Sequence, residues 1–70
     1  MKAFILDLKR QRVQIGDKVY EVGTGKIETA RANRKGIFEE CEYFVEVPFK
    51  SIAGARLAIT LVEQHPSKYR

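Results

Sequence analysis

The segment Ile37-Phe-Glu-Glu-Cys-Glu-Tyr-Phe-Val-Glu-Val47 is the part of the chain that best indicates its fold. From Cys41 onward the odd positions are apolar, whereas the even positions carry carboxylates and Phe44. Side chains of a strand alternate between the two faces of a sheet, so this pattern predicts a strand buried on one face only. The strand should stop by Pro48, because proline cannot donate a hydrogen bond to a neighbouring strand.

Shorter segments of the same character precede this acidic strand. Gly16-Asp17 and Gly23-Thr24-Gly25 are turn signals, because glycine tolerates positive φ and aspartate can bond to the backbone two residues on. Between such turns lie runs rich in β-branched and aromatic residues, which favour strands. We therefore expect an antiparallel meander of four or five short strands, the earlier ones covering residues 3–9, 12–15, 18–22 and 26–33.

The last third of the chain changes character between Pro48 and Pro66. Residues 51–64 are rich in alanine and leucine, and Ser51 can accept hydrogen bonds at a helix N-terminus, so a helix is favoured. A strand stays open as the alternative for two reasons. Gly54 would cost a helix roughly 1 kcal/mol relative to alanine, and Leu57 and Ile59 belong to an alternating run. A helix here would be apolar almost all the way round, so one face should cover the sheet and the rest could pack on a second subunit.

Two resemblances agree with this element order. Val13-Gln-Ile-Gly-Asp-Lys-Val-Tyr20 resembles the opening of many small SH3-like barrels, in which Gly-Asp turns the chain into a strand. Four strands followed by a helix is also similar to the order in single-stranded nucleic-acid-binding whirly domains. Fold likeness of this kind does not assign a function. The expected fold is α+β and mainly β: a small antiparallel sheet or SH3-like barrel of four to five strands, followed by one C-terminal helix.

Length and composition predict one small domain, residues 1–70. No apolar run approaches the roughly 20 residues that span a bilayer, and the apolar N-terminal run is too short for a signal peptide. We therefore expect a cytoplasmic protein that does not bind or cross a membrane. Cys41 is the only cysteine, so it cannot form an intrachain disulfide, and its apolar neighbours favour a buried thiol. A core of this size could gain stability by forming a homodimer.

Charge is distributed unevenly along the chain. Residues 1–38 carry nine basic and four acidic groups, a net +5, residues 39–46 contribute −4, and residues 47–70 contribute +3, which together give the net +4. Two basic clusters, residues 9–12 and 31–35, fall where turns and strand ends are expected. Exposed Arg and Lys side chains suit phosphate contacts, although solvated turns would look the same. The predicted nucleic-acid-binding residues are Arg10, Arg12, Lys18, Lys26, Arg31, Arg34 and Lys35, with Tyr20 as a ring that could stack on a base.

Other functions remain open or are disfavoured. The acidic strand with Phe44, or the apolar helix, could instead bind a protein, as in a small inhibitor or adaptor. An oligomerising structural protein is a third possibility. Gly23-Thr24-Gly25-Lys26 lacks the length and the following Ser/Thr of a phosphate-binding P-loop, and His65 has no partners for a catalytic triad. The sequence therefore predicts a non-catalytic protein without a cofactor or a metal site.

Overall fold

The computed structural model describes residues 1–29 and 43–69, and this part of the chain contains five strands and one helix. The elements are β1 (Lys2–Asp7), β2 (Arg12–Ile15), β3 (Lys18–Glu21), β4 (Lys26–Thr29), β5 (Tyr43–Glu46) and α2 (Ile52–Gln64). The predicted α+β fold, mainly strand with one C-terminal helix, is confirmed. Two predicted strands are seen only in part, because residues 30–42, with Cys41 among them, lie outside the described residues.

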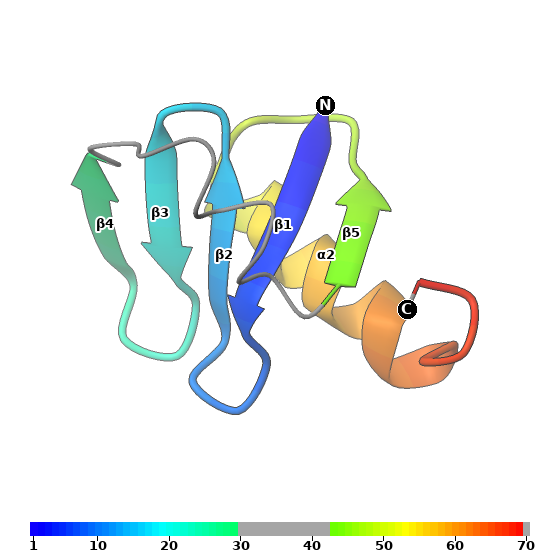
Figure 1. The fold of residues 1–70 in the computed structure, drawn as a ribbon. Helices are drawn as coiled ribbons and strands as arrows, with labels where there is room; N and C mark the ends of the chain where they lie inside the picture. Colours follow the sequence, from blue (N-terminus) through cyan, green and yellow to red (C-terminus); the bar gives the residue numbers. More distant parts are fainter. Residues whose placement is uncertain (30–42, 70) are drawn as a thin grey trace.

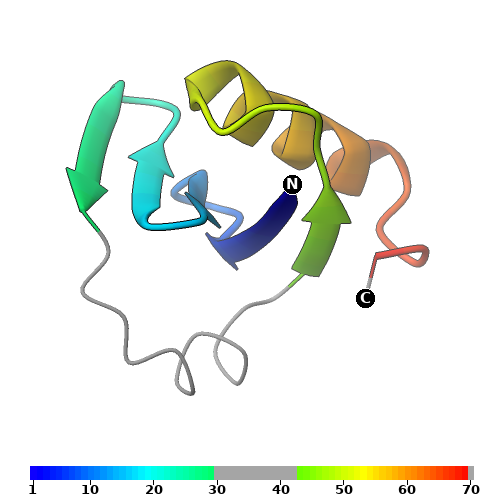
Figure 2. The same ribbon diagram turned by 90° about the horizontal axis from the view of Figure 1, so that it is seen from above.

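All five described strands belong to one antiparallel sheet in the order β4-β3-β2-β1-β5 (Figure 1). The first four strands form the predicted meander, and β5 pairs with the other side of β1, so Ala3 lies between Ile15 and Val45. Because β4 and β5 lie at opposite ends of this order, the described strands form an open sheet and not a closed barrel. The helix packs across one face of that sheet (Figure 2).

The turns explain the register of the meander. Gly16 has a φ of 62°, in the left-handed region that favours glycine, and the Gly16-Asp17 turn places Ile15 opposite Lys18. The register of β1 and β2 shifts between Ile5 and Asp7, which marks a bulge before the β1–β2 turn.

Helix α2 confirms the helical interpretation of this segment, and the strand alternative is wrong. The Oγ atom of Ser51 accepts a hydrogen bond from the N–H of Gly54 at 3.4 Å, and the helix ends at Gln64. A Cβ atom at Gly54 would lie 2.1 Å from the carbonyl oxygen of Phe49. The glycine therefore lowers helix propensity, but it lets the preceding loop approach the helix closely.

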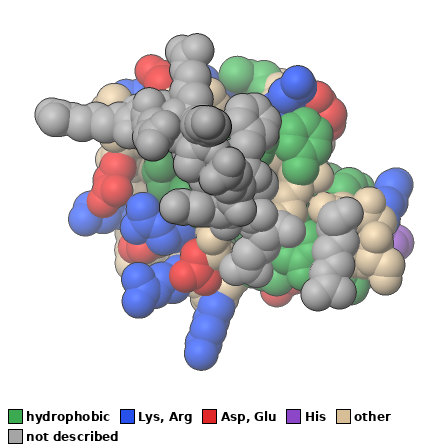
Figure 3. All heavy atoms as spheres, in the orientation of Figure 1, with side chains coloured by type: hydrophobic (Ala, Val, Ile, Leu, Met, Phe, Trp, Pro, Cys, Tyr) green, Lys and Arg blue, Asp and Glu red, His purple; other side chains and the backbone are tan. Residues whose placement is uncertain are grey.

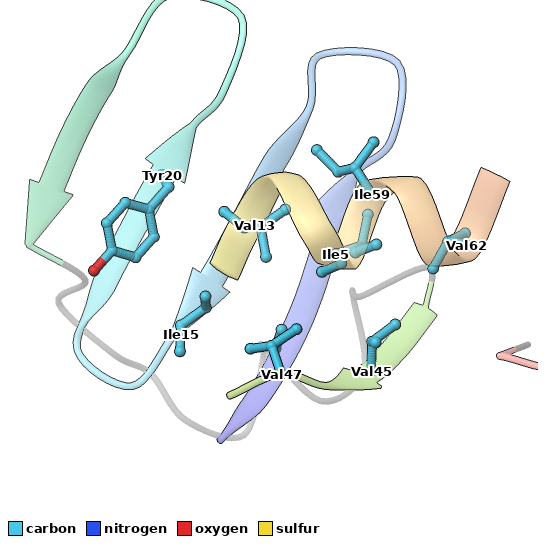
Figure 4. Close-up of a cluster of buried hydrophobic side chains, with 11 residues drawn as sticks. Ile5, Val13, Ile15, Tyr20, Val45, Val47, Ile59 and Val62 are labelled. Carbon is cyan, nitrogen blue, oxygen red and sulfur yellow. The ribbon is translucent and has the colours of Figure 1, made fainter. Parts of the chain in front are cut away.

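The core lies between α2 and the face of the sheet that it covers (Figure 4). Strand residues two apart share this face, and helix residues three or four apart meet them. The buried apolar residues of this cluster are Ala3, Ile5, Val13, Ile15, Tyr20, Val45, Val47, Ala55, Ala58, Ile59 and Val62. We call this side of the sheet the helix-side face and the other side, which α2 does not cover but on which Gln14 and Val19 are also buried, the open face.

The outer side of α2 differs from the sequence-based prediction. The sequence predicts a helix that is polar only at Arg56, Thr60, Glu63 and Gln64, with a further apolar face that could pack on a second subunit. The exposed helix positions are these four residues and Ala53, so no large apolar residue of the helix is fully exposed. The described large apolar residues with the most exposure lie elsewhere: Met1, Ile27, Phe44 and Phe49. The helix is therefore amphipathic, and its apolar side is directed at the sheet.

Candidate nucleic-acid interface

The β1–β2 turn presents two cations, Lys9 and Arg10. The N–H of Arg10 donates to Oδ1 of Asp7 at 3.1 Å, and the N–H of Gln11 donates to the carbonyl of Leu8 at 3.1 Å. These bonds close a tight turn, with Lys9 and Arg10 exposed at its tip. The side chain of Arg10 is 75% exposed and lies 3.8 Å from Oδ2 of Asp7. An exposed pair of this length is weak, so Arg10 can exchange its partner for a phosphate.

Antiparallel pairing brings two more of the predicted cations to the same end of the sheet. Arg12 starts β2, and its register partner on β3 is Glu21. Glu21 in turn pairs with Lys26, which starts β4. We name this end, with Lys9, Arg10, Arg12 and Lys26, the basic end of the sheet. In Figure 3 blue and red side chains lie close together at the lower left and bottom of the molecule.

Carboxylates are interleaved with these cations on the open face. Nη1 of Arg12 lies 3.7 Å from Oε1 of Glu21, and Nη2 lies 3.6 Å from Oε2 of Glu28. Nζ of Lys26 lies 3.1 Å from Oε1 of Glu28. The hydrogen bond from Lys26, together with its charge, holds the pKa of Glu28 below the ordinary value, and Arg12 acts in the same direction. The basic end contains four cations and three carboxylates, those of Asp7, Glu21 and Glu28, so its net charge is only +1.

Among the predicted cations in residues 1–29, Lys18 is the one that lies apart from the basic end. It lies beside Ile15 at the other end of β2, and its Nζ donates to Oγ1 of Thr29 at 3.3 Å. The neighbouring turn residue Asp17 forms an ion pair with Lys50 from the loop after β5. The hydrogen bond from Lys50 lowers the pKa of Asp17, and the same bond raises the pKa of Lys50. Lys18 therefore belongs to a different part of the surface from the basic end.

The ring predicted to stack on a base does not lie on the surface. Tyr20 is 4% exposed and belongs to the core, because its register partner Val13 also lies on the helix-side face. A buried ring cannot contact a base, so we correct this assignment. The signal was present in the sequence: the two-residue Gly16-Asp17 turn fixes the register that places Tyr20 opposite Val13.

Among the described strand residues, Phe44 is the aromatic side chain exposed on the open face. Its ring is 40% exposed, meets the ring of Phe4 edge-on at a centroid distance of 5.2 Å, and has Nζ of Lys2 at 5.9 Å. Glu46, two residues further along the strand, pairs with the N-terminal ammonium at 3.2 Å. This part of the acidic strand is thus accompanied by two positive groups, which the sequence pattern did not indicate.

Three predicted cations, Arg31, Arg34 and Lys35, lie outside the described residues. Within residues 1–29 and 43–69, no group of three or more His, Cys, Asp or Glu side chains could hold a metal ion. No helix in the same ranges is long and apolar enough to cross a membrane.

Comparisons with known proteins do not assign this chain to a family. No protein-family model matches it, and neither a curated protein nor a solved structure matches significantly.

Proposed function

We propose that this protein is a small, non-catalytic nucleic-acid-binding module that contacts phosphates through the basic end of the sheet. The observation that supports the proposal is the convergence of Lys9, Arg10, Arg12 and Lys26 from one turn and two strands. Charged groups from separate segments on one end of a rigid sheet can bind neighbouring phosphates together.

The carboxylates at this end set the expected strength of binding. The contacts of Arg12 with Glu21 and Glu28, at 3.7 and 3.6 Å, are longer than good hydrogen bonds, and these side chains are partly exposed. A phosphate can therefore replace a carboxylate without uncovering a buried charge. The displaced carboxylates still repel the phosphate, so we expect weak binding that depends strongly on salt.

Fluorescence anisotropy with labelled single- and double-stranded oligonucleotides, measured over a salt series, tests the proposal. The logarithm of the association constant should fall linearly with the logarithm of the salt concentration. The double variant Lys9→Ala/Arg10→Ala should reduce the slope of this line by about 1 to 2, because each lost phosphate contact contributes roughly 0.7 to 0.9.

A matched control removes the same charge elsewhere. Arg56 on the outer side of α2 and Lys68 near the C-terminus are exposed, and neither belongs to the basic end. The variant Arg56→Ala/Lys68→Ala should keep the wild-type slope. Absence of binding at low salt, or equal losses in both double variants, would show that the basic end is not a phosphate site.

Binding of a protein is the second candidate function, and the exposed ring of Phe44 on the acidic strand favours it. Exposed aromatic residues are typical of binding surfaces. The polar outer side of α2 makes the helix the weaker choice for such a contact. If Phe44 binds a protein, the variant Phe44→Ser should lose a cross-linked partner that the wild type retains. The variant Phe49→Ser, in which another exposed ring is removed, should retain it.

A further inference from the structure

The two outer strands of the described sheet differ in how open their edges are. On β5 the N–H of Phe44 donates to the carbonyl of Tyr69 at 3.5 Å, so the C-terminal segment covers part of that edge. On β4, the sheet of the described residues continues on one side only, toward β3. An outer strand has backbone N–H and C=O groups that can pair with another strand. The edge of β4 is therefore the better place to look for a partner.

The hydrogen-bond pattern shows which backbone groups of β4 point outward. The N–H of Val22 donates to the carbonyl of Gln11 on the β2 side, whereas the carbonyl of Glu21 accepts from Gly25 on the β4 side. Residues of an antiparallel strand alternate between the two sides, so Glu21 and Val19 direct their groups at β4. Their partners Lys26 and Glu28 point back at β3. Ile27 and Thr29 consequently direct their N–H and C=O groups at the outer edge.

The side chains of β4 alternate in chemistry as well. Lys26 and Glu28 lie on the open face, and Ile27 lies on the helix-side face as the partner of Tyr20. Helix α2 packs on β1, β2, β3 and β5 but does not reach β4, which lies outside its span (Figure 2). Ile27 is accordingly 54% exposed, the highest value among the described large apolar residues. An exposed isoleucine at the margin of the core can gain burial from an added strand.

These observations fit one partner, a second copy of this chain. We propose that β4 pairs with β4 of another molecule in an antiparallel, two-fold symmetric arrangement centred on Ile27. In this register Ile27 lies opposite Ile27 of the partner subunit, and their outward backbone groups exchange two hydrogen bonds. Lys26 then lies opposite Glu28 of the partner subunit, and the symmetry repeats this pair. The two charge pairs occupy the positions without mutual backbone hydrogen bonds, where opposing side chains come closest.

Shifting the pairing of the two β4 strands to a neighbouring register gives less favourable contacts. If the two-fold axis passed through Glu28, two Glu28 carboxylates would lie opposite each other. The backbone N–H and C=O groups of Glu28 point at β3, so they could not form the central hydrogen bonds. If the axis passed between Ile27 and Glu28, Ile27 would lie opposite Glu28 of the partner subunit. The side chains of the added strand would then point to the wrong faces of the sheet. Charge and hydrogen-bond pattern therefore select the same register. The contact is short, so the dimer should be weak and concentration-dependent, and it does not require nucleic acid.

Sedimentation equilibrium of single and mixed variants tests the dimer and its register. Wild type should form dimers as its concentration rises. Lys26→Glu alone opposes Glu to Glu, and Glu28→Lys alone opposes Lys to Lys, so each should weaken self-association by about tenfold. An equimolar mixture of the two variants restores both pairs and should associate at least as tightly as the wild type. Phe49→Ser should dimerise like the wild type.

Hydrogen exchange of the wild-type protein gives a test that does not depend on the folding of any variant. The amide of Ile27 should become more protected as protein concentration rises, and the amide of Glu28, which points at β3, should change less. Three results would each overturn the proposal: a monomer at every concentration, no association in the mixture of variants with intact circular dichroism, or Ile27 protection that is independent of concentration.

Discussion

The helix-side face and the open face are built from alternate residues of the same strands, but their chemistry differs. The helix-side face places Ile5, Val13 and Val45 side by side under α2, all of them almost completely buried. The open face carries the ion pairs of Arg12 at one end and the exposed ring of Phe44 at the other. The helix therefore gives one side of the sheet a continuous apolar core, whereas the other side combines the buried Gln14 and Val19 with exposed charged and aromatic side chains.

The largest expected effect comes from a cavity on the helix-side face. Ile5 is fully buried on β1 between β2 and β5, so Ile5→Ala should lower the free energy of unfolding by about 2–5 kcal/mol. Urea denaturation followed by circular dichroism measures the change. Phe44→Ala, on the open face, removes a larger side chain that is already 40% exposed and should cost about 1 kcal/mol. Equal losses from the two variants would mean that the two faces do not differ in their contribution to stability.

A smaller loss is expected where α2 meets the loop before it. Gly54→Ala favours the helix by roughly 1 kcal/mol through propensity, but the added methyl group would lie 2.1 Å from the carbonyl oxygen of Phe49. We expect a net destabilisation of about 1–3 kcal/mol, measured by the same denaturation. Ala53→Gly, at the exposed neighbouring position, isolates the propensity effect and should cost about 1 kcal/mol. A Gly54→Ala variant more stable than the wild type would show that the loop can move away.

The smallest effect concerns the ion pair of Asp17 and Lys50, which joins the β2–β3 turn to the β5–α2 loop. The pKa of Asp17 is lower in the folded state than its ordinary value of 3.8, chiefly because Lys50 hydrogen-bonds to it. The resulting stabilisation is present above that ordinary pKa and is lost as the pH falls through the folded-state pKa. The melting temperature of the wild type should therefore fall as the pH drops below about 4, and in Lys50→Met this fall should be smaller. In Lys9→Ala the fall in melting temperature below about pH 4 should be the same as in the wild type.

Much of the fold follows from local patterns in the sequence. Gly16-Asp17 and the glycines around Thr24 mark turns, and Ser51 and Pro66 bracket a helix, because these residues act on the backbone within a few positions. The candidate site could be predicted only in part. Arg10, Arg12 and Lys26 come together as cations at one end, but the neighbouring carboxylates Glu21 and Glu28 reach them through strand pairing. A segment-by-segment count of charge does not detect such pairs.

By itself the sequence determined the order of strands and helix and the alternation that gives each strand two faces, since both depend on residues that are neighbours along the chain. Only the tertiary structure decided which face the helix covers. That choice buries Tyr20 and leaves Phe44 exposed, and it also leaves β4 with Ile27 beyond the reach of α2. Burial and ion pairing depend on segments far apart in the sequence, so they are settled when the sheet and the helix pack together.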